Sequence, residues 1–234
     1  MVTGASSGIG KAVAVECSKM GAIIIATGRD KVRLQETFSL LDQTKPNQQF
    51  AADLTQHSDI EKLVSTLPSL NGIVHCAAII KKLPLKFISE KALQEITSAN
   101  VFAPVILSQQ IHKKKLLNSK GSVVFISSIA SSVASLGNIM YMSTKGALNS
   151  LAKGMALELS EKGIRVNCIE PALIRTNLTD VLTQSDLENY QKKFPLGRFG
   201  KPEEIAYAAI YLLSDATEWM TGSIIKIDGG VTLC

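Results

Sequence analysis

The fold is decided by a glycine-rich stretch near the start of the chain, Thr3-Gly4-Ala5-Ser6-Ser7-Gly8-Ile9-Gly10. It follows the apolar pair Met1-Val2 and opens a segment, residues 10–20, whose apolar spacing is that of a helix. Glycines let a backbone turn sharply and come close to a ligand, and the helix that follows offers free N–H groups and a partial positive charge. This strand–turn–helix context predicts a pyrophosphate-binding turn, with ligand contacts from Gly4, Ser6, Ser7, Gly8, Ile9 and Gly10.

The strand in front of this turn is short. A strand at the centre of a sheet needs about 5 residues, whereas Met1-Val2 supplies only two. We therefore expect the natural chain to have several more residues upstream of Met1.

Apolar runs of strand length alternate with longer helical segments along the whole chain. The runs are mostly continuous, which is typical of strands buried on both faces, and they cover residues 23–26, 73–74, 123–126, 166–169 and 224–227. The clearest later helical segments are 58–67, 90–115, 143–161 and 202–213. This alternation predicts an α/β fold, a doubly wound parallel sheet of about seven strands with helices on both faces. No linker or repeat divides the chain, so we expect one domain over residues 1–234.

Composition excludes several classes of protein. Of 234 residues, 46% are hydrophobic, which suffices for a buried core, and no apolar run reaches the roughly 18 residues of a membrane span. Three scattered histidines and four separated cysteines predict neither a metal site nor a disulfide framework, and no signal peptide is visible. We therefore expect a reduced, cytoplasmic protein that binds no metal and no membrane.

The net charge of +5 is modest and is not interleaved with aromatic residues, which argues against nucleic-acid binding. The only dense basic run is Lys113-Lys114-Lys115, with Lys120 shortly after. It is either a solvated helix end or a landing patch for an acidic partner.

The residues after the second predicted strand bear on the choice of cofactor. An acid at this strand end accepts hydrogen bonds from a ribose 2′-hydroxyl and repels a 2′-phosphate, whereas an arginine pairs with the phosphate. Arg29 follows the strand-end residue Gly28, so the sequence favours NADP(H). Asp30 would favour NAD(H) instead if its side chain pointed toward the ribose.

A tyrosine and a lysine are spaced for one helix face. Tyr141 and Lys145 are four residues apart, about one helical turn, and Ser128 follows the apolar run 123–126. Residues at the carboxyl ends of parallel strands line the ligand crevice of such a sheet. We therefore expect Ser128 to face that crevice together with this pair.

Taken together, these motifs resemble those of the short-chain dehydrogenase/reductase family, of the single-domain type with a Rossmann fold. The resemblance covers the whole chain and rests on Thr3–Gly10, Asp53-Leu54, Asn100, Ser128, Tyr141 with Lys145, Pro171 to Thr176 and Asp228-Gly229-Gly230. It implies an NAD(P)-dependent oxidoreductase that reduces a carbonyl to a secondary alcohol or oxidises the alcohol.

The resemblance implies a role for each catalytic residue. Tyr141 would be the general acid/base, its pKa lowered by the nearby Lys145 ammonium. Ser128 would hydrogen-bond the substrate oxygen, and Lys145 would also hold the nicotinamide ribose. Asn100 would anchor a water molecule that links Lys145 to solvent.

Further cofactor contacts are implied by position. Asp53 would meet the adenine amino group, with Leu54 beside the ring. The backbone at Ala77 and Ala78 would pass near the adenosine. On the nicotinamide side the resemblance implies Pro171, Ile174 and Thr176, with backbone groups of Ile174 bonding the carboxamide.

The chain departs from the family pattern at two places. His75-Cys76-Ala77-Ala78 stands where the family commonly has Asn-Asn-Ala-Gly, and Pro171-Ala172 stands where it has Pro-Gly. A methyl group at Ala172 could narrow the nicotinamide pocket. For His75 we favour a structural role over a catalytic one, and for Cys76 and Cys168 a role as small core residues.

The substrate is not named by the sequence. Residues 175–197 would form the substrate lid by analogy, and the tail from Pro195 resembles 3-oxoacyl-(acyl-carrier-protein) reductases most closely. Acyl carrier protein docks on basic residues around the active-site mouth of those enzymes, and Lys120 and Lys162 lie near their basic positions. A 3-oxoacyl thioester is therefore one substrate class, and a sugar or other small alcohol is the alternative.

The resemblance also bears on assembly. Helical segments 90–115 and 143–161 are apolar on more than one face, and the family uses them as an interface, so we expect a homotetramer. A non-catalytic nicotinamide-binding sensor or scaffold is a remote alternative, because such proteins often lose the serine, tyrosine and lysine that are kept here.

Overall fold

A computed structural model describes residues 1–176 and 190–233 of the chain. Its centre is a seven-stranded sheet in the order β3-β2-β1-β4-β5-β6-β7, in which every neighbouring pair runs parallel. The strands are β1 Val2–Thr3, β2 Ile25–Gly28, β3 Gln48–Ala51, β4 Leu70–His75, β5 Leu117–Ile126, β6 Arg165–Pro171 and β7 Ile224–Ile227. The predicted doubly wound parallel sheet is confirmed.

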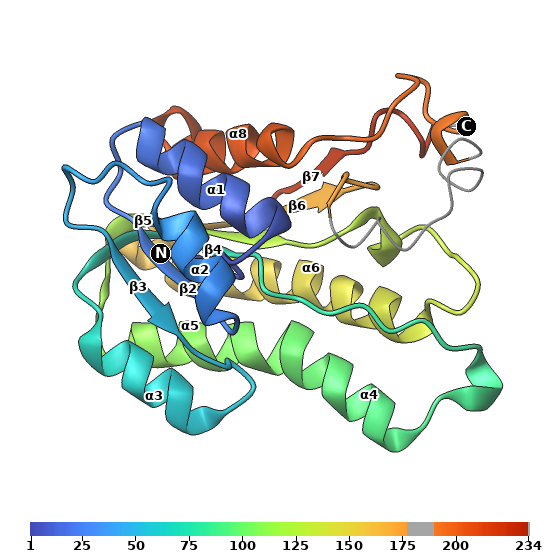
Figure 1. Ribbon diagram of the computed structural model, residues 1–234, viewed down its shortest axis with the longest axis horizontal. Coiled ribbons are helices and arrows are strands. Elements are labelled where there is room, and N and C mark those ends of the chain that lie inside the picture. Colours follow the sequence, from blue (N-terminus) through green and yellow to red (C-terminus); the bar gives the residue numbers. More distant parts are fainter. Residues whose placement is uncertain (177–189, 234) are drawn as a thin grey trace.

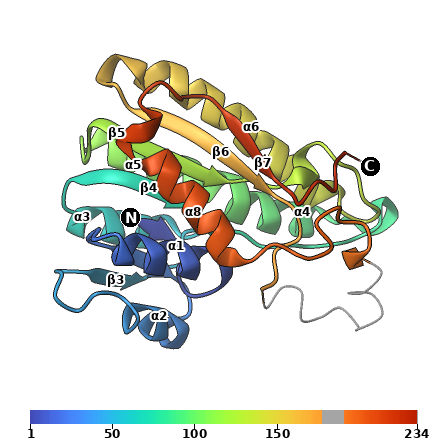
Figure 2. The same cartoon turned by 90° about the horizontal axis from the view of Figure 1, so that it is seen from above.

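Helices cover both faces of this sheet (Figures 1 and 2). One layer holds α1 Gly8–Lys19, α2 Lys31–Phe38 and α8 Pro202–Leu213. The other holds α3 His57–Thr66, α4 Glu90–Thr97, α5 Ala103–Lys113 and α6 Ile139–Leu159. Single turns of 3₁₀ helix lie at Leu85–Phe87, Ile129–Ser131, Ser160–Lys162 and Asp215–Thr217.

Strand β5 shows why its apolar run is continuous. Val124 and Ile126 pack into the core beneath α1 and α8, whereas Val123 and Phe125 pack into the core beneath α3, α5 and α6. Successive side chains of a strand point to opposite faces, so a strand covered by helices on both sides must be apolar at every position.

The structure differs from the sequence prediction at four places. Helix α2 and strand β3 were not predicted, because α2 buries only Leu34 and Thr37, and β3 is an edge strand with a polar sequence. The single helix expected over 90–115 is interrupted by a π-helical turn at Ser98–Phe102. Helix α6 begins four residues before the predicted start at 143.

The carboxyl ends of the strands meet at one edge of the sheet, toward the right of Figure 1. The glycine-rich turn and the residues that follow β2, β4, β5 and β6 all lie at this edge. Ligands of open parallel sheets bind at this edge, so the fold by itself locates the candidate site.

Within the described ranges, no helix has both the length and the apolar character needed to cross a bilayer.

Candidate active site

The turn between β1 and α1 can be built only from glycine at two positions. Gly4 has a φ of +65°, and a Cβ there would lie 2.8 Å from the backbone nitrogen of Ala77. A Cβ on Gly10 would lie 2.2 Å from the carbonyl oxygen of Gly4. Both obstacles are backbone atoms that cannot move aside, so the turn packs as closely as a phosphate-binding loop requires.

Helix α1 presents an open N-terminus at this turn. Ser7 stands at the N-cap position but makes no side-chain cap bond, and the first turn contains no acidic residue. A Cβ on Gly8 would lie 3.3 Å from Cγ2 of Thr176, and one on Gly28 would lie 3.0 Å from Oγ of Ser6. The loop after β6 and the end of β2 therefore border the same helix terminus. This cradle fits the pyrophosphate of a dinucleotide, because it combines exposed N–H groups with room that only glycine leaves.

The two residues after Gly28, Arg29 and Asp30, differ in their hydrogen bonding. Asp30 caps α2, where Oδ1 accepts the backbone N–H of Arg33 at 3.0 Å and Oδ2 accepts its Nε–H at 2.7 Å. These bonds, the backbone one first, lower the pKa of Asp30 and occupy both carboxylate oxygens. Arg29 is exposed. Its guanidinium is thus the free charged group of this pair at the end of β2.

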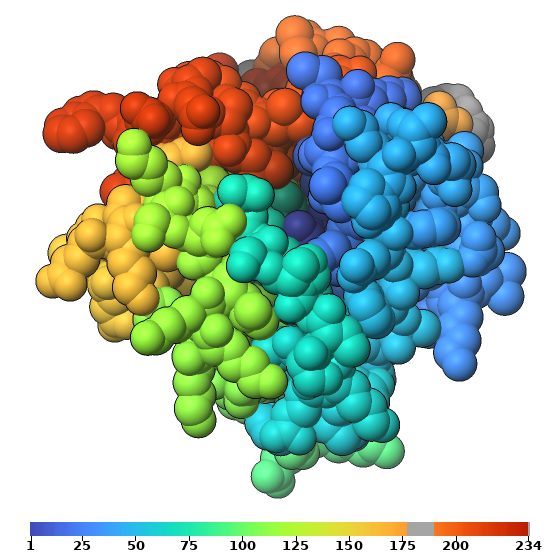
Figure 3. Space-filling view, turned by 90° about the vertical axis from the view of Figure 1, so that its left-hand side faces the viewer, coloured from blue at the N-terminus to red at the C-terminus, as the bar shows by residue number. Residues whose placement is uncertain are grey.

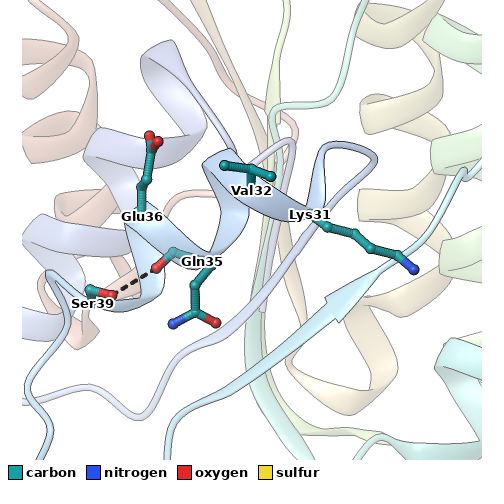
Figure 4. A pocket seen from close by; sticks show the side chains of 5 residues that line it. All are labelled: Lys31, Val32, Gln35, Glu36 and Ser39. Atoms are coloured by element: carbon teal, nitrogen blue, oxygen red, sulfur yellow. Dashed lines mark hydrogen bonds between the residues drawn. The ribbon is translucent and has the colours of Figure 1, made fainter.

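Helix α2 brings a further cation to the same strand end. Lys31 is its first residue and extends away from Gln35 and Glu36 (Figure 4). These three residues, with Val32 and Ser39, line a hollow on the outside of α2. The hollow is built on one helix and lies apart from Ser128, Tyr141 and Lys145.

The predicted catalytic residues meet between β5 and α6. The hydroxyl of Ser128 lies close enough to that of Tyr141 to act on its pKa. Lys145 is 3% exposed, its Nζ lies 5.5 Å from the centre of the Tyr141 ring, and it donates to the carbonyl of Ile126 at 2.8 Å. Helix α6 starts early enough for Tyr141 to be helical, so the four-residue spacing places both side chains on one face.

Burial disfavours the charged form of both groups. It raises the pKa of Tyr141 to about 12, against the lowering effect of the Ser128 hydroxyl, so the structure does not give the lowered pKa that was expected from Lys145. It lowers the pKa of Lys145 to about 8, opposed by the thiols of Cys76 and Cys168. At neutral pH Tyr141 is therefore a phenol, a group that can give a proton to a ligand.

Asn100 lies in the π-helical turn and acts as a clamp. Its Oδ1 accepts the N–H of Ile79 at 2.8 Å, and its Nδ2 donates to the Ile79 carbonyl at 2.9 Å and to Oγ1 of Thr144 at 3.1 Å. The amide thus ties the loop after β4 to α6 beside Lys145. Both N–H groups of this amide are engaged with protein atoms, and the water contact expected for Asn100 stays a prediction.

His75 is a buried structural residue, as the sequence favoured. Its ring stacks on Phe125 at 4.8 Å between centroids, and its Nε2 lies 3.0 Å from Oγ of Ser108. Burial lowers the pKa of His75 to about 3, so the ring is neutral. Cys168 is fully buried, and Cys76 is partly exposed, with its N–H donating to Oγ1 of Thr3 at 3.1 Å.

The remaining cofactor residues are spread along the edge of the sheet. Asp53 follows β3, and its Oδ1 accepts from the backbone and hydroxyl of Thr55. Leu54 is buried in the core, so its side chain faces away from solvent. Ala77 donates its N–H to Oγ1 of Thr3 at 3.2 Å, and Ala78 is exposed.

Ile174 is held by a bridge to Gly200. The bridge uses the carbonyl of Leu173 and the N–H of Arg175, at 3.2 and 2.9 Å. In a parallel pairing, the residues before and after the bridged residue supply its hydrogen bonds. The N–H and carbonyl of Ile174 itself therefore point away from Gly200. Pro171 ends β6, and its carbonyl lies 3.5 Å from Oγ of Ser128.

The expected basic docking residues lie at the wrong edge. Lys120 precedes the buried part of β5 and Lys162 precedes β6, so both are at the amino ends of the strands. Figure 3 shows the molecule from the side where the strands begin. The two lysines are neighbours there, because a Cβ on Gly163 would lie 3.4 Å from Cγ of Lys120. Eight residues of strand, roughly 25 Å, separate Lys120 from Ser128. The prediction that these lysines border the mouth of their own active site is therefore wrong.

Part of the predicted lid, residues 177–189, lies outside the described residues, so the lid over 175–197 stays a prediction. One group of residues was missed altogether: Glu170, Ser131 and Asn149 form a partly buried polar contact near the predicted catalytic residues. An acid directly after the apolar strand run 166–169 was the signal that could have found it.

Comparison with known proteins agrees with this geometry. Residues 4–232 match the family described as enoyl-(acyl carrier protein) reductase. A 3-oxoacyl-(acyl-carrier-protein) reductase of Rickettsia felis is 30% identical over 233 residues, covering 100% of this chain and 96% of its own. A tropinone reductase homologue of Arabidopsis thaliana is 36% identical, covering 100% and 90%. The structure of a short-chain type dehydrogenase/reductase from Mycobacterium ulcerans superposes with a TM-score of 0.90 at 32% identity, covering 99% and 88%. Matches of this extent show that the chain belongs to the short-chain dehydrogenase/reductase family of oxidoreductases.

Proposed function

We propose that this protein is an NADP(H)-dependent reductase that converts a carbonyl to a secondary alcohol. The observation that carries the proposal is the contact of Ser128 with Tyr141, with Lys145 behind the tyrosine ring. When bound, the reduced nicotinamide supplies the hydride that the carbonyl carbon accepts.

The chain's own residues supply the proton and hold the oxygen. Tyr141 donates its phenolic proton to the carbonyl oxygen, and the hydroxyl of Ser128 donates a hydrogen bond to the same oxygen as negative charge develops there. The ammonium of Lys145 stabilises the tyrosinate that remains. The high pKa of Tyr141 suits this direction, since the phenol is loaded with its proton throughout the neutral range.

The preference for NADP(H) is supported by the end of β2. Both carboxylate oxygens of Asp30 accept hydrogen bonds from Arg33, whereas Arg29, just before Asp30, is exposed. Lys31 follows Asp30 and adds a second cation. Cations without a competing carboxylate favour a 2′-phosphate over a bare ribose. NAD(H) is the alternative if Asp30 leaves its helix cap.

A 3-oxoacyl thioester is the first substrate class to test, because the 3-oxoacyl reductase relative matches over the full chain. The second class is a small ketone or alcohol, including a sugar, and the tropinone reductase homologue at higher identity favours it. Lys120 and Lys162 do not support docking of an acidic acyl carrier protein at the active-site mouth, because both lie at the opposite edge of the sheet.

A homotetramer is also part of the proposal. Several large apolar side chains are exposed, among them Trp219 at 103% and two in the helical segments expected to form the interface, Phe102 at 57% and Leu157 at 78%. Exposed apolar surface of this kind commonly marks an interface. Sedimentation as a monomer would contradict this part.

The test is a titration followed by turnover. The protein is titrated separately with NADPH and NADH while nicotinamide fluorescence is followed, and then acetoacetyl-coenzyme A or tropinone is added. Tighter binding of NADPH and loss of its absorbance with either ketone support the proposal. Equal turnover with NADH contradicts the role of Arg29, and cofactor binding without turnover of any ketone or alcohol favours a sensor or scaffold.

A further inference from the structure

A carboxylate is buried beside the catalytic residues. Glu170 is 4% exposed and lies in β6 between Ile169 and Pro171. Among the described residues, no lysine, arginine or histidine forms an ion pair with it, although Lys226 is its neighbour on β7. A buried carboxylate without a cation costs folding free energy. Its presence in a strand that is buried along its whole length therefore calls for a reason other than stability.

The carboxylate joins three separate elements. Oε1 of Glu170 accepts the hydroxyl of Ser131, in the 3₁₀ turn Ile129–Ser131, and the side-chain N–H of Asn149, on α6, at 2.6 Å. Strand β6, the turn after β5 and the helix of Tyr141 and Lys145 are thus held together through one oxygen atom.

The turn that Glu170 holds is the one that begins at Ser128. Oγ of Ser128 accepts the N–H of Ala130 at 3.2 Å, and its carbonyl accepts the N–H of Ser131 at 3.0 Å. Ser131 is therefore coupled to Ser128 within one short turn. The bond from Ser128 to the Pro171 carbonyl is long, at 3.5 Å, so it fixes the turn only weakly.

On the helix side, Asn149 continues the catalytic face. It lies four residues after Lys145 and eight after Tyr141, about one and two turns along the same face. Its Oδ1 is buried without a hydrogen-bond partner among the described residues. A reversed amide would set two acceptors against each other, so the carboxylate dictates the orientation of this amide even though its oxygen is left unpaired.

We propose that Glu170 is a positioning residue, which clamps the Ser128 turn to helix α6 and so sets the approach of the Ser128 hydroxyl to that of Tyr141. It touches neither substrate nor cofactor. This inference rests on the roles proposed for Ser128 and Tyr141, and it adds a residue that acts through them.

The test compares Glu170→Ala, which removes the acceptor, with Glu170→Gln, which keeps an acceptor oxygen of similar reach and removes the charge. Ser132→Ala is the control, because Ser132 is exposed and bonds only within its own turn, to the carbonyl of Ile129. Hydrogen exchange at the amides of Ala130 and Ser131 reports on the turn without any substrate. Steady-state kinetics with NADPH and the better ketone of the titration report on its consequence.

For Glu170→Ala we expect faster exchange at both amides and a fall of about 10- to 100-fold in kcat, the cost of misplacing a reacting group, with the KM for NADPH unchanged. Glu170→Gln should restore slow exchange and most of the kcat, and Ser132→Ala should match the parent protein. Unchanged exchange or unchanged kcat in Glu170→Ala overturns the proposal, and so does an equal loss in Glu170→Gln. Tyr141→Phe, measured alongside, distinguishes failure of the proposed mechanism from failure of the positioning role. If Tyr141→Phe is active, the proposed mechanism fails. If it is inactive while Glu170→Ala has normal activity, only the positioning role of Glu170 fails.

Discussion

The hydroxyl of Ser127 donates a hydrogen bond of 3.0 Å to the backbone carbonyl of Lys145. The side chain of Lys145 returns a bond of 2.8 Å to the carbonyl of Ile126. These reciprocal bonds fasten the end of β5 to the middle of α6, one residue before Ser128. The lysine is therefore oriented by the protein itself, which is the preorganisation that an electrostatic role requires.

Replacement of Tyr141 by phenylalanine tests the proton donor. The ring and its packing remain, but the phenolic proton is lost, so kcat for ketone reduction should fall by about 10²- to 10⁴-fold. Binding of NADPH, followed by fluorescence, should change little. Tyr207→Phe is the matched control, because Tyr207 is exposed on α8 and should leave kcat unchanged. Activity retained in Tyr141→Phe would assign the proton transfer to another group.

Replacement of Arg29 by alanine tests the cofactor preference. Loss of a charged hydrogen-bonding partner of the 2′-phosphate should raise the Kd for NADPH by about 10- to 100-fold, equivalent to roughly 1.5–3 kcal/mol, and leave that for NADH nearly unchanged. Titration with both cofactors checks this. Lys19→Ala, at the far end of α1, removes a cation without touching the site and should alter neither Kd. Parallel losses for both cofactors would show that Arg29 does not read the phosphate.

Replacement of Gly10 by alanine tests the close packing of the turn. The added Cβ would lie 2.2 Å from the carbonyl oxygen of Gly4, which is backbone and cannot rotate away. We expect the free energy of unfolding to fall by about 1–3 kcal/mol or more and cofactor binding to weaken with it. Urea denaturation measures the first effect. Lys11→Ala, one residue later in α1, provides the baseline for an ordinary change in that helix.

The features that could be predicted are those set by residues close together in the sequence. Gly4 and Gly10 are needed because a Cβ at either position would collide with backbone atoms. The spacing of Tyr141 and Lys145 is meaningful once the segment is helical. The sheet could be predicted because its inner strands contain continuous apolar runs, such as Val123–Ile126 in β5. Strand β3 was not predicted because it lies at an edge of the sheet and begins with two polar residues, Gln48 and Gln49, and none of its four residues is fully buried.

The parts that could not be predicted depend on three-dimensional position. Glu170 forms hydrogen bonds with Ser131 and Asn149, which lie 39 and 21 positions earlier in the chain. No local sequence pattern predicts such a contact. The prediction for Lys120 and Lys162 is wrong because Lys120 precedes the buried part of β5 and Lys162 precedes β6, whereas the site lies where these strands end. A residue before a strand and one after it lie at opposite ends of the sheet, however close they are in sequence.

Acid sensitivity should trace in part to His75. Burial lowers the pKa of His75 to about 3 from an ordinary value of 6.5. Between these two pH values the unfolded chain therefore binds a proton that the folded chain does not bind. Stability therefore rises with pH in this window: the contribution is complete above pH 6.5 and is lost as the pH falls toward 3, at up to about 1.4 kcal/mol per pH unit.

The measurement is urea unfolding at several pH values between 7.5 and 4.5, comparing the parent protein with His75→Asn. The variant should be less stable at pH 7.5, because it loses the stacking on Phe125. Its free energy of unfolding should nevertheless depend less steeply on pH below 6.5, since asparagine takes up no proton. His112→Asn, at an exposed position on α5, serves as the control and should retain the parent slope. Identical slopes in the parent and His75→Asn would mean that the buried ring is not the source of acid sensitivity.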